Sequence, residues 1–240
     1  MINIVVPMAG RGSRFSKAGY SLPKPLLPVF GRPMIEVVIE NLRPTQPHRF
    51  IFICQQEHLT EYNLESTLLE AGPDTLIIPI DFITEGAACT VLLAEANINN
   101  DDALMIANCD QYIATSIDVY LKRMEKGNYD GFIMTMTADD PKWSFIGLDD
   151  NKHVTHVVEK KVVSNEATVG IYNYRRGRDF VAAANEMIAS NERTNSEFYV
   201  APAYNYMIQR GMRVGYMNIG ADRAGMYGLG VPEDLEYFNT

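Results

Sequence analysis

The stretch Met-Ile-Asn-Ile-Val-Val-Pro-Met-Ala-Gly-Arg-Gly-Ser-Arg at residues 1–14 decides the fold class. Residues 2–6 form a near-continuous apolar run, which is typical of a parallel strand buried on both faces. Gly10 and Gly12 follow the strand directly and allow a tight turn whose backbone N–H groups point toward one site. A buried strand followed by a glycine-rich turn indicates an α/β protein with a potential anion-binding loop near its N-terminus.

Strand-like and helix-like segments alternate through the first half of the chain. The predicted strands are 2–6, 49–54, 76–80 and 103–107. The predicted helices begin with Pro33 at an N1 position, span 58–70 and 87–96, and run from a Ser116 cap to Met124. This alternation predicts a mostly parallel mixed sheet covered by helices on both faces.

After Asp130 the pattern changes to short strands separated by turns such as Asp139-Asp140-Pro141. The predicted strands are 132–136, 145–148, 154–158, 168–174 and 213–218, and the predicted helices are 178–189, 201–209 and 232–238. No repeat, linker or low-complexity tract interrupts the chain. We therefore predict one domain over residues 1–240, a three-layer, Rossmann-like α/β/α sandwich whose two halves share one sheet.

Composition narrows the class of protein further. A chain of 240 residues and 27.0 kDa can bury about 70% of its surface, enough for one α/β domain. Contents of 47% hydrophobic and 21% charged residues exclude a disordered chain or a coiled coil. The net charge of −9 disfavours nucleic acid and anionic membranes as partners, so any anionic ligand needs a local cluster of cations.

Three features of the chain favour a cytoplasmic location. No apolar run reaches the ~20 residues that a membrane helix needs. The opening residues have neither the basic segment nor the cleavage site of a secretory signal. The odd number of cysteines, three in all, indicates reduced thiols rather than disulfides.

Two neighbouring loops carry the candidate anion site. Gly-Arg-Gly-Ser-Arg at 10–14 lacks the Gly-Lys-Ser/Thr of the Walker A motif and the third glycine of the dinucleotide fingerprint. A glycine pair of this kind alone is more often an ordinary turn than a phosphate-binding nest. Pro-Lys-Pro-Leu-Leu-Pro at 23–28 holds Lys24 between two prolines that stiffen its backbone. The combination of Arg14 and Lys24 around one glycine turn is a more specific signal of a phosphate-binding site than either motif alone.

Gly-x-Gly-Ser-Arg-Phe, Pro-Lys-Pro-Leu-Leu-Pro-Val and Gly-Arg-Pro-Met-Ile together resemble the signature of the sugar-phosphate nucleotidyltransferase (nucleotide-sugar pyrophosphorylase) family. The likeness continues in the family's order through Glu-Gly-Ala-Ala at 85–88, Asn-Cys-Asp at 108–110, Glu-Lys at 159–160, Gly-Ile-Tyr at 170–172 and Gly-Val-Pro-Glu-Asp-Leu at 230–235. The opening Val-Pro-Met-Ala-Gly is most similar to small bacterial capsule-pathway members, including cytidylyltransferases that act on phosphoglutamine.

The resemblance implies a Mg²⁺-dependent transfer of a nucleoside monophosphate from an NTP to a small phosphorylated acceptor, with release of pyrophosphate. The acceptor would be phosphoglutamine-like or a sugar 1-phosphate, and the product a precursor of capsule or surface polysaccharide. Residues 1–130 would form the nucleotide-binding half and residues 131–240 the acceptor-binding half.

The resemblance also implies roles for single residues. Arg14 would neutralise the β- and γ-phosphates, Lys24 would bridge the α-phosphate and the attacking phosphate, and Lys160 would hold the acceptor phosphate. The two substrates carry a charge of about −6 together, which several cations and a metal must offset. The predicted nucleotide-binding residues are Met8, Ala9, Gly10, Gly12, Ser13, Arg14, Asp81, Gly86 and Ala87. The predicted acceptor-binding residues are Glu159, Lys160, Gly170, Tyr172 and Glu197.

The predicted metal site and the predicted choice of nucleotide base rest on three carboxylates. Asp110 follows the strand 103–107 at the carboxyl edge of the sheet, where the family's metal aspartate falls, and offers the oxygen ligand that Mg²⁺ prefers. The family's second metal carboxylate is replaced by Gly228, so Asp222, Asn218 or water is expected in its place. Asp81 falls where many uridine- and thymidine-using relatives carry glutamine. Because a carboxylate accepts a hydrogen bond from the cytosine amine and repels the uracil O4, CTP is the favoured nucleotide.

Two other function classes stay open. A glycosyltransferase of the related GT-A fold would need Asp-x-Asp where Asn-Cys-Asp stands at 108–110, and would leave Arg14 and Lys24 without a purpose. A non-catalytic nucleotide-binding relative that regulates a partner is suggested only by Gly228. The sequence leaves the acceptor open, and a homodimer is expected from family analogy alone.

Overall fold

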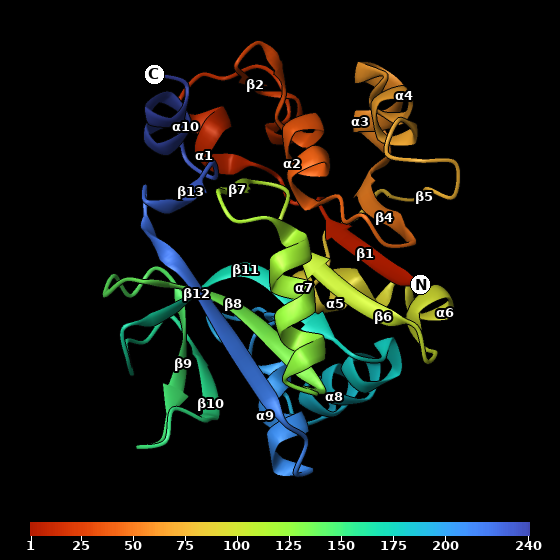
Figure 1. Cartoon of the computed structure of the whole chain (residues 1–240). Coiled ribbons are helices and arrows are strands. Elements are labelled where there is room, and N and C mark those ends of the chain that lie inside the picture. The colour runs from red at the N-terminus through yellow and green to blue at the C-terminus, as the bar shows by residue number, and fades with distance from the viewer.

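The computed structural model describes residues 1–240 without a gap. Figure 1 shows one twisted sheet with helices packed against both of its faces. The predicted single-domain, three-layer α/β/α fold is therefore confirmed. No helix combines the length and the hydropathy that crossing a membrane requires.

The main sheet has eleven strands and the chain forms ten α-helices. The strands are β1 (Ile2–Pro7), β4 (His48–Gln55), β5 (Leu76–Ile80), β6 (Ala103–Ala107), β7 (Gln111–Ile113), β8 (Gly131–Thr137), β9 (Ser144–Leu148), β10 (Val154–Glu159), β11 (Glu166–Tyr174), β12 (Val214–Asp222) and β13 (Gly225–Gly228). The helices are α1 (Ser13–Lys17), α2 (Met34–Leu42), α3 (Gln56–Tyr62), α4 (Leu64–Leu69), α5 (Ala87–Leu92), α6 (Glu95–Ile98), α7 (Ile117–Lys126), α8 (Gly177–Ala189), α9 (Ala203–Gln209) and α10 (Pro232–Phe238). A separate small sheet pairs β2 (Pro28–Val29) with β3 (Arg32–Pro33), and a 3₁₀ turn, η1, spans Lys24–Leu26.

Strand β1 lies inside the parallel part of the sheet. It pairs in parallel with β4 and with β6, so both of its edges are hydrogen-bonded. Ile4, Val5 and Val6 have no exposed surface, as expected for a strand covered on both faces. The order across the sheet is β5-β4-β1-β6-β11-β8-β12-β13-β7. From β5 to β12 every strand except β11 runs in the same direction, which makes the sheet mostly parallel.

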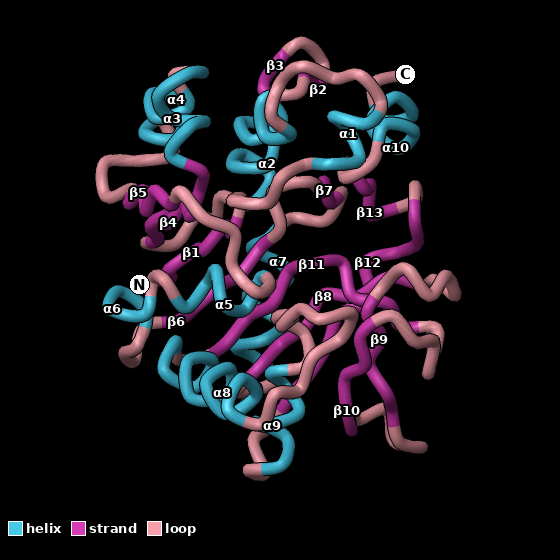
Figure 2. Tube along the Cα trace, turned by 180° about the vertical axis from the view of Figure 1, so that it is seen from behind, coloured by secondary structure: helices cyan, strands magenta, loops and turns pink.

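Two apolar cores lie on opposite faces of the sheet. One has 36 buried residues and packs α2 and α7 against the sheet through side chains such as Val38 and Tyr120. The other has 30 buried residues and packs α5, α8 and α9 through side chains such as Phe180 and Tyr204. Helix α7 crosses the near face of the sheet in Figure 1, and α8 and α9 lie in front when the molecule is seen from behind in Figure 2.

The parallel strands present their carboxyl ends at one edge of the sheet, where open α/β sheets bind ligands. The glycine-rich loop follows β1 at this edge, Asp81 follows β5, and Asp110 lies three residues after the end of β6. Strand β11 runs the opposite way and places Gly170 beside Asn108 at the same edge. The topology therefore gathers residues from both halves of the sequence.

Two helices that the sequence predicts as continuous are interrupted. The predicted helix over 58–70 is α3 followed by α4, because Asn63 between them adopts a left-handed conformation with a φ of 53°. The predicted helix over 87–96 is α5 followed by α6. The N–H groups of Leu93 and Ala94 bond carbonyls three residues back, which tightens the last turn of α5 and ends it.

Smaller differences concern single positions and short strands. Pro33 is the N-cap of α2 and belongs to β3, so its predicted N1 position is wrong by one residue. Ser116 is the N-cap of α7 as predicted, but its side chain makes no capping hydrogen bond. The strands β7 and β13 were not predicted. They pair with each other in antiparallel fashion and place Gly228 opposite Gln111.

Candidate active site

The loop after β1 turns at Gly12 and begins α1 at Ser13. Gly12 has a φ of 58°, a left-handed conformation that glycine adopts without strain. A Cβ at this position would lie 3.4 Å from the Cβ of Lys24, so the loop packs closely on the Pro-Lys-Pro segment. The two loops that carry the predicted cations are therefore in contact.

Lys24 reaches from this contact to the end of β6. Its Nζ donates a hydrogen bond of 2.7 Å to Asp110 Oδ2, and the two side chains are 23% and 22% exposed. Burial lowers the pKa of Lys24, but the Asp110 carboxylate more than offsets this and raises the pKa above its ordinary value. The positive charge of Arg14 opposes part of that rise in the pKa of Lys24. Lys24 is therefore a fixed ammonium group at all physiological pH values.

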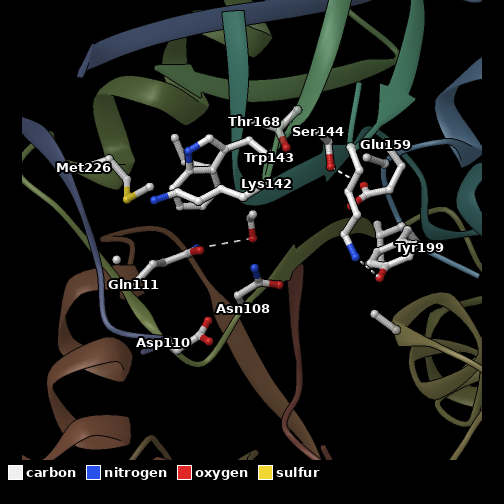
Figure 3. A pocket seen from close by; sticks show the side chains of 18 of the residues that line it. Asn108, Asp110, Gln111, Lys142, Trp143, Ser144, Glu159, Thr168, Tyr199 and Met226 are labelled. Carbon is white, nitrogen blue, oxygen red and sulfur yellow. Dashed lines mark hydrogen bonds between the residues drawn. The ribbon is translucent and has the colours of Figure 1, made fainter. Parts of the chain in front are cut away.

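A first cavity of about 470 Å³ opens beside this ion pair, within the size range of small-ligand sites. Figure 3 shows its walls, with Asp110, Asn108 and Gln111 on one side and Ser144, Glu159 and Tyr199 across from them. The 22 lining residues are Arg14, Ala87, Asn108, Asp110, Gln111, Lys142, Trp143, Ser144, Glu159, Lys160, Thr168, Val169, Gly170, Tyr172, Tyr199, Val200, Ala201, Met226, Gly228, Gly230, Val231 and Asp234. Both halves of the chain therefore contribute to one site.

Two cations line the first cavity without a carboxylate partner. The exposed Arg14 in α1 makes no ion pair, and its guanidinium group makes no hydrogen bond in the structure. Lys160 Nζ donates a 2.6 Å hydrogen bond to the hydroxyl of Tyr199 and lies 4.7 Å from the centre of its ring. In a protein with a net charge of −9, uncompensated cations at a cavity wall are well suited to bind phosphate oxygens.

Glu159, at the end of β10, lies in the same wall and faces hydroxyl groups. Ser144 Oγ donates a hydrogen bond to its Oε2, drawn as a dashed line in Figure 3. Burial raises the pKa of Glu159, although Ser144 and Lys160 partly oppose the rise. Nearby, Thr168 and Tyr172 share a 2.9 Å hydrogen bond between their hydroxyls. This wall can therefore bind the hydroxyl or amine groups of a ligand as well as its phosphate.

Gly170 is required by close packing at the centre of the site. It has a φ of 79°, and a Cβ there would lie 2.2 Å from Asn108 Nδ2 and 2.6 Å from Gln111 Oε1. Its carbonyl accepts hydrogen bonds from the Asn108 backbone N–H at 3.0 Å and from Gln111 Nε2 at 3.2 Å. The predicted acceptor-binding glycine therefore shapes the cavity by letting β11 approach the end of β6.

Close packing also explains why residue 86 is a glycine, and this explanation differs from the one that the sequence suggests. The sequence suggests that a glycine here lets a base lie against the backbone. In the structure a Cβ at Gly86 would lie 2.5 Å from the backbone N and O of Phe198, and the φ of 132° favours glycine. The Phe198 N–H donates to the Glu85 carbonyl at 2.8 Å, which fastens this loop to the start of α5.

Glu197 does not line the first cavity but acts on a residue that does. It lies in a tight turn in which Asn195 and Ser196 both have positive φ. Burial raises the pKa of Tyr199, and the Glu197 carboxylate raises it further. The Tyr199 hydroxyl accepts a hydrogen bond from Lys160, so Glu197 acts on the predicted phosphate-binding lysine indirectly, through Tyr199.

A second cavity of about 450 Å³ adjoins the glycine-rich loop on its other side. Of the predicted nucleotide-binding residues, Gly10, Gly12 and Asp81 line it, together with Lys24. Lys24 lines this cavity, and its ion-pair partner Asp110 lines the first one. Other lining residues are Arg11, Ser16, Tyr20, Ser21, Leu22, Pro23, Gln55, Glu57, His58, Tyr62, Phe82 and Ile83.

Met8, Ala9 and Ser13 line neither cavity. Met8 and Ala9 are 3% and 6% exposed and pack in the cores. The Ala9 carbonyl accepts a 2.7 Å hydrogen bond from Gln55 Nε2. Any nucleotide contact by Met8 or Ala9 would therefore involve the backbone, and their predicted role stays a prediction.

The carboxylates at the site suit a hard cation held jointly with a substrate. Asp110 and Asp234 line the first cavity, but no three His, Cys, Asp or Glu residues form a metal-ligand cluster. Mg²⁺ is usually held by one or two carboxylates together with substrate phosphates, so the donor set fits it. Asp222 lines neither cavity, and its carboxylate lies 3.8 Å from Lys142 Nζ.

The sequence assigned no role to several residues that line the site. Trp143 and Lys142 come from the loop before β9, and the Lys142 Nζ lies 4.9 Å from the centre of the Trp143 ring. Tyr199 and Ser144 support Lys160 and Glu159. Asn108 and Asp234 lie in family motifs, which could have singled them out. Nothing in the local sequence distinguishes the other residues named here.

Comparison with known proteins places this geometry in a family. The model of the nucleotidyl transferase family matches residues 4–220. The bifunctional protein GlmU of Methanococcus maripaludis is 26% identical over 216 residues, which cover 88% of this chain and 48% of that protein. GlmU of Burkholderia vietnamiensis is 28% identical over 221 residues, which cover 89% of this chain and 46% of that protein. The chain thus spans about half the length of these curated relatives.

Solved structures that share this fold cover nearly the whole chain. A nucleoside-diphosphate-sugar pyrophosphorylase from Vibrio cholerae matches with a TM-score of 0.82 and 28% identity, over 98% of this chain and 99% of that chain. The UTP-bound UGPase of Acinetobacter baumannii matches with a TM-score of 0.74 and 17% identity, over 100% of this chain and 92% of that chain. Because the family model matches residues 4–220, most of its length, the chain belongs to the nucleotidyl transferase family.

Proposed function

We propose that this protein transfers a nucleoside monophosphate from an NTP to a small phosphorylated acceptor and releases pyrophosphate. The observation that carries the proposal is the presence of three cations and the Asp110 carboxylate at one site. Lys24 contacts Asp110 at 2.7 Å, and Arg14 and Lys160 line the cavity that Asp110 also lines. Such a cluster in a chain of net charge −9 suits a reaction between two phosphorylated substrates.

The reaction needs little covalent chemistry from the protein. The acceptor phosphate is itself the nucleophile, and one of its oxygens attacks the α-phosphorus while the bond to the β-phosphate oxygen breaks. Arg14 stabilises the charge of the leaving pyrophosphate. Lys24, which lines the second cavity and pairs with Asp110 of the first, bridges the α-phosphate and the attacking phosphate. Lys160, oriented by Tyr199, holds the acceptor phosphate. No general base is required.

Magnesium fits this site through Asp110, whose carboxylate is a hard oxygen donor at the cavity wall. The ion would polarise the phosphate oxygens and reduce the repulsion between the two substrates. Asp110 would hold it, and the Lys24 ammonium beside Asp110 would add a fixed positive charge in the same place.

We assign residues 1–130 to the nucleotide and residues 131–240 to the acceptor. The base of the nucleotide would lie in the second cavity, its phosphates would extend to Arg14 and Asp110 in the first cavity, and the acceptor would bind in the first cavity beside them. Asp81 at the second cavity supports CTP, because its carboxylate can accept a hydrogen bond from the cytosine amine. Glu159 and the hydroxyls near it support an acceptor that has hydroxyl or amine groups besides its phosphate. Phosphoglutamine-like compounds and sugar 1-phosphates both meet this requirement. The product would serve capsule or surface polysaccharide synthesis in the cytoplasm, with the enzyme acting as a homodimer.

A pyrophosphate-release screen tests the proposal. The four NTPs with Mg²⁺ are paired with hexose 1-phosphates, heptose phosphate, phosphocholine, aminoethylphosphonate and phosphoglutamine, and Asp110→Asn serves as the control. Pyrophosphate is expected only when an NTP and a matching acceptor are both present, with CTP preferred. Sugar transfer from a nucleotide sugar without pyrophosphate release would instead indicate a glycosyltransferase. Tight NTP binding without turnover on any acceptor would indicate a non-catalytic relative.

A further inference from the structure

Gly228 leaves an unfilled space at the place where the family's second metal carboxylate is expected. It is not among the glycines with positive φ, so its backbone does not require glycine. A Cβ at Gly228 would meet nothing closer than Asp234 Oδ2 at 3.6 Å and Trp143 Cη2 at 3.9 Å. The space beside Gly228 therefore faces a carboxylate oxygen that comes from another part of the chain.

That carboxylate belongs to Asp234, in the first turn of α10. Its Oδ1 accepts a 2.8 Å hydrogen bond from Arg223 Nη2, and the side chain is 17% exposed. Arg223 thus fixes the orientation of the carboxylate while Oδ2 accepts no hydrogen bond from the protein. A carboxylate fixed on one side and free on the side of the cavity has the geometry of a prepared ligand.

Asp110 is tied to the same segment of chain. A Cβ at Gly230 would lie 2.7 Å from Asp110 Oδ2, and the Leu229 backbone N–H donates to the Asp110 carbonyl at 2.8 Å. The carboxylate of Asp110 thus lies against Gly230 and that of Asp234 against Gly228, two residues earlier. Both side chains line the first cavity.

We propose that Asp234 supplies the second carboxylate of the divalent-cation site, through Oδ2, in place of the side chain that Gly228 lacks. Arg223 is the positioning residue that holds Asp234 in this orientation. The inference rests on the proposed nucleotidyl transfer, which brings the phosphates that complete the coordination. Asp222, the nearer candidate in sequence, lies beside Lys142 outside the cavity and is not the ligand.

Binding of Mn²⁺ to the purified chain, followed by electron paramagnetic resonance of the free ion, tests the inference. The titration is run with Mn²⁺ alone and again with inorganic pyrophosphate present. Asp234→Asn is expected to weaken Mn²⁺ binding on the order of 10-fold or more, and Asp110→Asn is expected to have a similar effect. Asp222→Asn is expected to leave the affinity unchanged.

Glu233→Gln is the matched control. Glu233 lies in the same turn of α10 and is 3.8 Å from Arg223, but it is 87% exposed. If loss of negative charge near Arg223 were sufficient, this variant would weaken Mn²⁺ binding as much as Asp234→Asn. The double variant Gly228→Asp with Asp234→Asn moves the carboxylate to the family's position, and we expect it to recover a substantial part of the lost affinity.

Three outcomes would overturn the inference: an Asp234→Asn variant that binds Mn²⁺ like the wild type, an Asp222→Asn variant that loses the site, or a wild type without a site under either condition. Thermal melting of each variant establishes that it is folded. A chain that binds Mn²⁺ through Asp234 but releases no pyrophosphate with any acceptor would refute the proposed function and leave the cation site intact, so the two failures are distinguishable.

Discussion

Lys24 and Asp110 form a 2.7 Å ion pair that joins the Pro-Lys-Pro loop to the end of β6, although 86 residues separate them in sequence. The ammonium group offsets the charge of Asp110 before any ligand binds, and it lines the second cavity while Asp110 lines the first. One contact therefore links the candidate nucleotide site, the candidate acceptor site and the candidate metal ligand.

Arg14 should be essential for turnover and dispensable for folding. It is exposed, lines the first cavity and makes no ion pair, so Arg14→Ala removes no contact that stabilises the fold. We expect the rate of pyrophosphate release to fall about 100-fold or more, which is typical for loss of one group that stabilises developing charge. Lys17→Ala is the control, since Lys17 lies in the same helix and lines neither cavity. Equal losses in the two variants would contradict a specific role for Arg14.

Replacement of Lys24 should change metal binding and turnover in opposite directions. Its ammonium group and a divalent cation compete for Asp110, because Lys24 already donates to Oδ2. Lys24→Met is therefore expected to bind Mn²⁺ more tightly than the wild type when no nucleotide is present, and to lose turnover. Calorimetric titration with Mn²⁺ measures the first effect. Weaker Mn²⁺ binding by the variant would show that Lys24 and the cation do not compete.

The contact between Gly86 and Phe198 should matter for stability. In Gly86→Ala the new Cβ would lie 2.5 Å from backbone atoms of Phe198 at a φ of 132°, so the loop has to move. We expect a loss of about 3 kcal/mol in the free energy of unfolding. Gly10→Ala is the control, because nothing lies within 4 Å of its Cβ position, and a change of about 0.5 kcal/mol or less is expected. Urea denaturation compares the two, and equal effects would contradict the packing argument.

Glu159 should make stability depend on pH. Burial raises its pKa in the folded protein above the ordinary value of 4.5, so the folded state binds the proton more tightly than the unfolded state. Its contribution to stability is complete below pH 4.5 and is lost as pH rises through the raised pKa. The wild type should therefore lose stability relative to Glu159→Gln as pH increases across this interval. Urea denaturation of both proteins at several pH values measures the difference, and a constant difference would refute the raised pKa.

Local patterns in the sequence were sufficient for most of the fold. The apolar run of β1 is buried by strands on both sides, and a strand of that composition has few other stable environments. The Pro-Lys-Pro segment similarly limits its own backbone, so the position of Lys24 beside the glycine loop could be predicted. The periodicity of the apolar residues did not reveal the break at Asn63, because that pattern continues across it, although asparagine adopts the left-handed conformation more readily than most residues.

The site was predictable only in part, because several of its features come from contacts between distant segments. Gly86 is a glycine because Phe198 packs against it, and Gly170 because Asn108 does. The proximity of Asp234 to Gly228 depends on the path of the chain from β13 into α10, so the sequence indicated Asp222 as a nearer substitute. Only the folded chain brings these residues together.

The fate of labelled phosphates tests the central claim most directly. The protein is incubated with Mg²⁺, the panel of phosphorylated acceptors and an NTP labelled either at the α-phosphate or at the γ-phosphate. The account predicts that the α-label appears in a new compound containing the acceptor, while the γ-label appears in pyrophosphate and not in inorganic phosphate. An α-label that never joins an acceptor, or a γ-label released as inorganic phosphate, would contradict nucleotidyl transfer at this site.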